Sequence, residues 1–268
     1  MKKLKYKFKN DMLFKTLFCR YPDLLKQLVS ELLGIKLENI ELFIITNPEI
    51  YPENIQDKFC KLDINMTVNG QHVNLEIQVR DENNYPERVM YYWAREYSTA
   101  LTKGNDYIEL PRTIIISIID FNLFMCEEFH SEFKPLEINR YELLSDKMSI
   151  HIFELNKIPA NINKKDMLLL WLSLFKAETV EELKKIEAME VPVMNQAINA
   201  YYNITSESEF REKERLYEKA RHDEASALNY AREKEREKWQ VIVADREAKI
   251  ADKDAEIARL NAELEKRQ

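Results

Sequence analysis

The stretch of sequence that decides the fold is KFCKLDINMTVNGQHVNLEIQVR, which runs from Lys58 to Arg80. Two runs of alternating apolar and polar residues flank the dipeptide Asn69-Gly70. An Asn-Gly pair between such runs is the strongest short signal for a β-hairpin closed by a two-residue type I′ turn. We therefore predict two antiparallel strands, at Lys58–Val68 and Gln71–Arg80.

The turn also sets the register of the hairpin. If Val68 faces Gln71, the same ladder places Asp63 opposite Glu76. Successive side chains point to opposite faces of a strand, so the two faces can be listed. The apolar face comprises Leu62, Ile64, Met66, Val68, Val73, Leu75, Ile77 and Val79. The polar face comprises Lys61, Asp63, Asn65, Thr67, His72, Asn74, Glu76 and Gln78. A slip by one residue would mix the two sets, which supports this register.

On the polar face, Asp63 and Glu76 are the pair of residues whose chemistry most clearly indicates a functional role. Directly opposed residues have Cβ atoms about 4.5–5.5 Å apart. Two carboxylates this close repel unless they share a proton, contact a cation or point into water. Mg²⁺ typically binds one or two carboxylates and keeps several waters, and Gln78 could orient a water or a phosphate oxygen. The alternative is an ordinary amphipathic hairpin whose polar face is solvated.

The segments around the hairpin predict helices and further strands. Asn10 can cap a helix from Asp11 to about Leu33, which Pro22 breaks or kinks and Gly34 ends. Other expected elements are a strand at Ile40–Ile45, a loop at Asn47–Gln56, a helix at Tyr85–Lys103, strands at Arg112–Ile119 and Ser149–Leu155, and helices at Lys164–Lys176 and Val180–Met189. This order predicts an α/β fold, with α+β as the alternative, built on a mixed sheet flanked by helices.

The C-terminal tail, residues 207–268, has a different composition. It holds 17 acidic and 15 basic residues but no Gly and no Pro, which predicts a long exposed helix. Apolar residues recur every seven positions at Val243, Ile250, Ile257 and Leu264. The second heptad position holds Trp239, Arg246, Lys253, Leu260 and Arg267. This thin seam predicts a coiled coil and a homodimer, with a solvated single helix as the alternative. We divide the rest into a core at 1–125 and an extension at 126–206.

The overall composition limits the function classes. The 268 residues have a formal net charge of −7, which argues against coating nucleic acid by bulk charge. Sparse cysteines without a CxxC pair are typical of a reducing cytosol. The Lys-rich N-terminus lacks a signal-peptide apolar region, and the apolar runs are too short to span a bilayer. We therefore expect a soluble, cytoplasmic protein. The histidines lack zinc-ligand spacing, and no phosphate-binding glycine loop is present.

Although the chain has a net negative charge, clustered basic residues could contact the phosphates of a nucleic acid. For each basic residue, the alternative is an ordinary surface position. The candidates are Lys2, Lys3, Lys5, Lys7, Lys9, Lys15, Arg20, Lys26, Arg80, Arg88, Arg95 and Lys103.

Several segments resemble the Rpn family of recombination-promoting nucleases, also described as PD-(D/E)XK nuclease family transposases. They are residues 10–18 (NDMLFKTLF), 61–64 (KLDI), 74–78 (NLEIQ), 88–93 (RVMYYW), 104–107 (GNDY) and 144–147 (LSDK). The resemblance extends from about residue 7 to about residue 190 and leaves the tail uncovered. It implies a restriction-endonuclease-like core in the order helix, three strands, helix, strand.

The resemblance also implies a function and a site. The function is a Mg²⁺-dependent DNA endonuclease, with Mn²⁺ as a substitute, associated with recombination, mobile elements or phage defence. Asp63 and Glu76 would be the metal ligands. Gln78 stands where the superfamily motif has Lys, and Asp11 matches the acid of the N-terminal helix and could reach the site. For Asp11 the alternative is a first-turn acid favoured by the helix dipole. A catalytically weak, nuclease-like DNA-binding or assembly scaffold is the alternative function.

Overall fold

The computed structural model of the chain describes residues 2–47, 63–100 and 106–265. The chain divides into two compact units, Met1–Glu207 and Ser208–Gln268. The first unit contains every strand of the described residues and the second is a single helix. Among the helices of the described residues, none combines the length and the apolar character needed to cross a membrane.

In the described residues, the first unit is built on a mixed sheet of six strands, in the order β1-β2-β3-β4-β6-β5. The strands are β1 (Phe43–Ile45), β2 (Ile64–Val68), β3 (Gln71–Gln78), β4 (Thr113–Ile119), β5 (His130–Phe133) and β6 (Met148–Glu154). The pairs β3–β4 and β4–β6 are parallel, and the remaining pairs are antiparallel. The predicted fold class is confirmed.

The β2–β3 hairpin has the predicted register. Its ladder runs from Ile64 opposite Leu75 to Val68 opposite Gln71. Asn69 (φ 49°) and Gly70 (φ 79°) both have positive φ, as a type I′ turn requires. Strand β3 ends at Gln78, two residues before the predicted end at Arg80. Residues 58–62 of the other predicted strand lie outside the described part of the chain.

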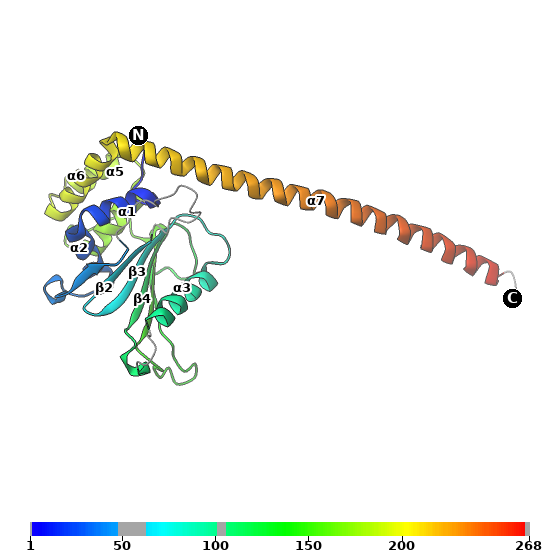
Figure 1. Cartoon of the computed structure of the whole chain (residues 1–268), viewed down its shortest axis with the longest axis horizontal. Helices are drawn as coiled ribbons and strands as arrows, with labels where there is room; N and C mark the ends of the chain where they lie inside the picture. The colour runs from blue at the N-terminus through cyan, green and yellow to red at the C-terminus, as the bar shows by residue number, and fades with distance from the viewer. Residues whose placement is uncertain (1, 48–62, 101–105, 266–268) are drawn as a thin grey trace. The chain divides into compact units, whose positions relative to one another are not determined.

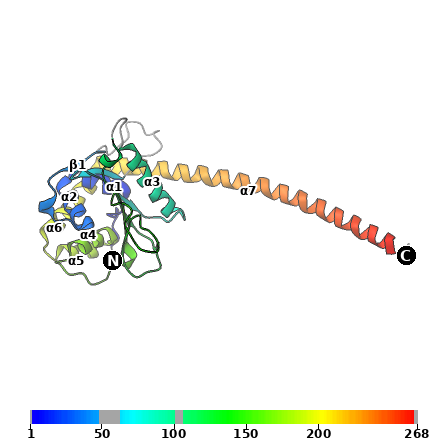
Figure 2. The ribbon, with the colours of Figure 1, turned by 90° about the horizontal axis from the view of Figure 1, so that it is seen from below.

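Helices cover both faces of the sheet (Figure 1). They are α1 (Asp11–Arg20), α2 (Pro22–Leu33), α3 (Tyr85–Thr99), α4 (Met167–Lys176), α5 (Val180–Glu187) and α6 (Pro192–Ser206), with short 3-10 helices at Leu37–Asn39, Tyr107–Glu109 and Leu155–Lys157. Helix α3 lies on one side of the sheet and α1, α2, α5 and α6 on the other, which a second view shows from below (Figure 2). The site described next depends on α3.

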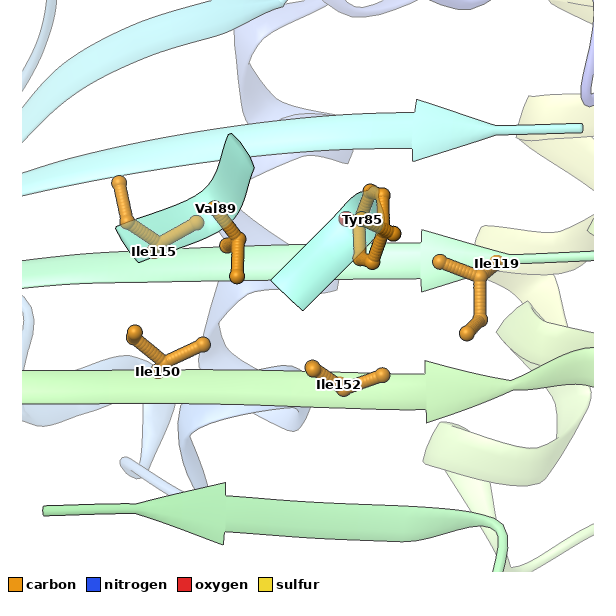
Figure 3. Packing of buried hydrophobic residues seen from close by; sticks show 6 residues of the cluster. All are labelled: Tyr85, Val89, Ile115, Ile119, Ile150 and Ile152. Carbon is orange, nitrogen blue, oxygen red and sulfur yellow. The ribbon is translucent and has the colours of Figure 1, made fainter. Parts of the chain in front are cut away.

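Helix α3 is held to the sheet by a small apolar cluster. Tyr85 and Val89 project from the helix onto branched side chains of β4 and β6 (Figure 3). The sheet contributes Ile115, Ile119, Ile150 and Ile152 to this cluster. Burial of such side chains contributes roughly 1.5–3 kcal/mol each, so the first turn of α3 has a defined position over the sheet.

The expected break at Pro22 is confirmed, since α1 ends at Arg20 and Pro22 begins α2. Other elements differ from the sequence-based expectations. The expected strand at Ile40–Ile45 begins only at Phe43. Val79, assigned to the apolar face, is 40% exposed because β3 has already ended. Strand β5 and helix α6 were not expected at all. The expected loop at Asn47–Gln56 lies almost entirely outside the described residues.

The second unit is α7 (Ser208–Glu265), one continuous helix of 58 residues. The predicted long helix is thereby confirmed. The apolar heptad residues on it are exposed to solvent: Trp239, Val243, Ile250, Ile257, Leu260 and Leu264. The coiled coil itself stays a prediction.

The hairpin turn yields the first test. A Cβ added at Gly70 would meet no atom within 4 Å, so any effect of Gly70→Ala comes from its φ of +79°. We expect the free energy of unfolding to fall by about 1–2 kcal/mol in a urea titration, because a Cβ disfavours left-handed backbone. Gly70→Asn should lose less, since Asn tolerates this region. Equal losses for Ala and Asn would contradict this explanation.

Candidate active site

The carboxylates predicted to form the site flank the hairpin on the side of the sheet that faces α3. Asp63 is the residue immediately before β2, and Glu76 is near the end of β3. Strand β4 pairs Ser117 with Glu76 in parallel register, so their side chains share one face. Continuing the observed ladder by one residue places Asp63 opposite Glu76, as the sequence predicted.

The carboxylate of Glu76 is held by two hydroxyl groups. Its Oε1 accepts hydrogen bonds from the Tyr85 hydroxyl at 2.5 Å and from Ser117 Oγ at 3.1 Å. Tyr85 is the first residue of α3 and is 1% exposed. The helix that packs on the sheet therefore also delivers a donor to the carboxylate.

Burial dominates the electrostatics of this carboxylate. Desolvation raises the pKa of Glu76, and the charge of Asp63 raises it further. The hydrogen bonds from Tyr85 and Ser117 and the charge of Arg88 act in the opposite direction. Asp63 and Glu76 are thus close enough to repel one another, and a cation between them would relieve both the repulsion and the desolvation.

Asp63 is anchored by asparagine side chains. Its Oδ2 accepts from Asn74 Nδ2 at 2.6 Å, and the same nitrogen donates to Asn65 Oδ1 at 2.6 Å. Asn47 donates from Nδ2 to the Asp63 carbonyl at 3.1 Å and accepts from the Asn65 amide at 2.7 Å. The backbone and the carboxylate of Asp63 therefore both have fixed partners.

Gln78 sits on the same face of β3, and its amide is already oriented. Its Nε2 donates to the carbonyl of Arg80 at 2.7 Å. The amide oxygen is then the end of the side chain left to accept a hydrogen bond, for example from a water. Gln78 adds no positive charge to the site.

Asp11 comes to the same end of the sheet from the opposite face. Two residues before it, Lys9 pairs with Asp120 at 2.6 Å, and the Asp120 amide donates to the Gln78 carbonyl at 2.9 Å. The beginning of α1 is therefore near the carboxyl ends of β3 and β4. A role for Asp11 in the site stays a prediction.

Some of the basic residues proposed for phosphate contact have acidic partners. Lys7 pairs with Glu178 at 2.7 Å, and Lys9 lies 3.0 Å from the same carboxylate. Arg20 pairs with Glu207 at 2.7 Å. These ion pairs reduce the positive charge that the N-terminal lysines offer to a nucleic acid.

The donor set fits a hard divalent cation. Within residues 2–47, 63–100 and 106–265, no group of three or more His, Cys, Asp or Glu side chains could hold a metal ion. A site at Asp63 and Glu76 would consequently rest on two carboxylates, completed by waters and substrate oxygens. This is the arrangement that Mg²⁺ commonly adopts.

The polar face of the hairpin also borders a shallow cavity of about 190 Å³. Asn65, Thr67, His72 and Asn74 line it from the hairpin, and α3 contributes Glu96 and Thr99. The face is therefore partly covered by α3, which the alternative of a fully solvated hairpin did not anticipate.

Sequence reasoning missed Tyr85, Ser117 and Asn74. Ser117 carried a usable signal, since it is the one hydroxyl residue inside the run IIISII and is fully buried, and a buried hydroxyl requires a partner. Asn74 was opposite Asn65 in the predicted register but was not assigned a role. Tyr85 carried no local signal.

The Tyr85 contact leads to a stability test. Tyr85→Phe removes a hydrogen bond to the Glu76 carboxylate, and hydrogen bonds to charged groups contribute roughly 1.5–3 kcal/mol. We expect a loss of about this size in the free energy of unfolding, measured by urea titration. Tyr107→Phe is the matched control, because the Tyr107 side chain is 76% exposed. Equal stabilities for the two variants would show that the bond is unimportant.

Comparison with known proteins identifies the family. The family model for PD-(D/E)XK nuclease family transposases matches residues 8–231, which include the sheet, the carboxylate pair and the first part of α7. The match reaches farther along the chain than the predicted limit near residue 190. No curated protein and no solved structure matches the chain significantly. Nucleases of this family are hydrolases that generally use divalent metal ions. The chain belongs to the PD-(D/E)XK nuclease family transposases.

Proposed function

We propose that this protein is a Mg²⁺-dependent endonuclease that hydrolyses phosphodiester bonds in DNA, with Mn²⁺ as a substitute ion. The observation that carries the proposal is the placement of Asp63 next to Glu76, each held by uncharged donors. Asn74 holds one carboxylate, and Tyr85 and Ser117 hold the other. Uncharged donors orient carboxylates without cancelling the negative charge that attracts a cation.

The chemistry requires help because a phosphodiester repels hydroxide. A divalent cation at this position supplies Lewis acidity, which lowers the pKa of water and neutralises charge on the phosphate. Asp63 and Glu76 hold the ion in one place relative to the scissile strand. Gln78 positions the attacking water through its amide oxygen, and Asp11 contributes a further acidic group at the same end of the sheet.

The proposal extends to partners and setting. DNA is the substrate, in recombination, mobile-element movement or phage defence within the cytoplasm. The chain forms a homodimer through α7, whose exposed apolar stripe includes Val243, Ile250 and Ile257. Two copies would provide the two sites that cutting both strands of a duplex requires.

Cleavage of a supercoiled plasmid in Mg²⁺ or Mn²⁺ tests the site. We expect Asp63→Asn and Glu76→Gln each to lower the nicking rate by at least about 100-fold, because metal-centred charge stabilisation amounts to several kcal/mol. Glu127→Gln is the matched control, since it removes one carboxylate at an exposed position in the loop after β4. Its rate should equal that of the wild type.

Two outcomes would redirect the proposal. Equal nicking by the wild type, Asp63→Asn and Glu76→Gln would place the activity elsewhere. Binding of DNA by the wild type without nicking in either ion would favour the catalytically weak scaffold.

The homodimer is tested on the full chain by light scattering. Ile250→Lys combined with Ile257→Lys puts two charges into the apolar stripe, and we expect the mass to fall from dimer to monomer. Asp252→Lys is the control, because position 252 lies outside the heptad seam, and it should remain dimeric. An unchanged mass for the double variant would exclude the stripe as the dimer contact.

A further inference from the structure

Apart from the proposed metal ion, the site residues named so far bring no positive charge to the phosphate. Hydrolysis increases negative charge on the phosphate, yet the site residues Asp63 and Glu76 are acidic and Gln78 is neutral. The Gln78 nitrogen is also committed to the Arg80 carbonyl at 2.7 Å. A positively charged side chain that assists the metal ion would therefore have to come from another element.

Arg88 is placed to provide this charge. It lies three residues after Tyr85 on α3, so the two side chains share one side of the helix. The guanidinium carbon is 5.1 Å from the centroid of the Tyr85 ring, a distance typical of cation–π contacts. Tyr85 in turn donates to Glu76. Arg88, Tyr85 and Glu76 thus form a continuous series of contacts.

The ion pair that Arg88 makes is a solvent-exposed one. The acidic partner of Arg88 within the described residues is Glu82, at 3.3 Å, and the Glu82 side chain is 58% exposed. Exposed pairs of this kind contribute only about 0–1 kcal/mol, so this contact does not compete strongly with a phosphate.

The Arg88 side chain is only partly buried. It is 21% exposed, whereas its Nε is buried and has no hydrogen-bond partner in the described part of the chain. Because Nε is closed to solvent, a phosphate would be bound by the other two guanidinium nitrogens, which the contact with the Tyr85 ring keeps close to the site.

Other basic side chains are less suitable. Lys9 is 5% exposed and is paired with Asp120 and Glu178. Arg112 immediately precedes β4 and acts on His151, at the opposite end of the parallel strands from Gln78. Arg80 is exposed and lies beyond the end of β3.

We propose that Arg88 binds the phosphate of the DNA strand that is cut and supplies the positive charge that Gln78 cannot. This inference rests on the proposed nuclease function and assigns a substrate-binding, catalytic role to a residue of α3. The planar fork of an arginine suits two phosphate oxygens at once.

Two measurements on full-length protein test the role of Arg88. In Mg²⁺, Arg88→Gln should lower the rate constant for plasmid nicking by about 100-fold, the usual cost of one lost charge-stabilising donor. In Ca²⁺, used as a binding ion, the salt dependence of affinity for a duplex oligonucleotide should fall by about 0.9 in slope, which corresponds to one phosphate contact. Arg88→Lys should retain the slope and recover part of the rate.

The controls separate charge from structure. Arg140→Gln removes the same charge from an exposed position in the β5–β6 loop and should leave rate and slope unchanged. Glu82→Gln removes the ion pair but keeps the guanidinium, so its rate should stay within about threefold of the wild type. A loss in Glu82→Gln as large as that in Arg88→Gln would assign Arg88 a structural role.

The results also distinguish this inference from the proposed function. If Asp63→Asn abolishes nicking while Arg88→Gln nicks like the wild type with an unchanged slope, the inference fails and the nuclease stands. If the wild type never nicks but Arg88→Gln lowers the slope, the phosphate contact stands and the nuclease fails.

Discussion

The two-residue turn at Asn69-Gly70 is the constraint on which the rest of the site depends. It sets the register that brings Asp63 next to Glu76, and a slip of one residue would send both to the opposite face. The Asn69 side chain has a second role. Its Oδ1 accepts hydrogen bonds from the backbone amides of Glu41 and Leu42 at 2.9 and 3.0 Å. The residue that bends the chain thus also attaches the segment that leads into β1.

The second constraint is the desolvation of the Glu76 carboxylate, which is unfavourable in isolation. A desolvated carboxylate is stabilised only if donors and opposite charges replace the lost water. Here the replacement comes from Tyr85, Ser117 and Arg88, and two of these three belong to α3. The apolar contacts of Val89 with the sheet keep that helix in place. Packing that has no chemical role of its own therefore supports the polar arrangement of the site.

The elements predicted correctly are those with a strong local pattern. The hairpin alternates at a period of two residues, and β4 is a continuous branched run, so both can be recognised without knowing their neighbours. Strand β5 reads HSEF and forms an edge that, in the described part of the chain, pairs with β6 alone. Its polar residues carry no periodic signal, and its existence depends on β6 being present beside it.

The same distinction applies to the site. Asp63 and Glu76 follow from the register of one hairpin, whereas the Tyr85 contact requires the position of α3 over the sheet. Nothing in the sequence near Tyr85 specifies that position, because it results from side chains more than 30 residues away along the chain, such as Ile119 and Ile150. The two carboxylates could be predicted from the sequence, but the positions of the groups that orient them result from tertiary packing.

These contacts show how the formal net charge of −7 is compatible with binding a phosphate. Net charge governs the long-range approach of a polyanion, but the Debye length at physiological salt is only about 8 Å. The charged side chains that act on Glu76 include Asp63 and Arg88, and the positive end of the α3 dipole adds to the effect of Arg88. Lys7 and Lys9 are largely neutralised by Glu178 and Asp120. An acidic protein can therefore bind a phosphate at this position, provided that a divalent cation offsets the carboxylates and Arg88 remains accessible.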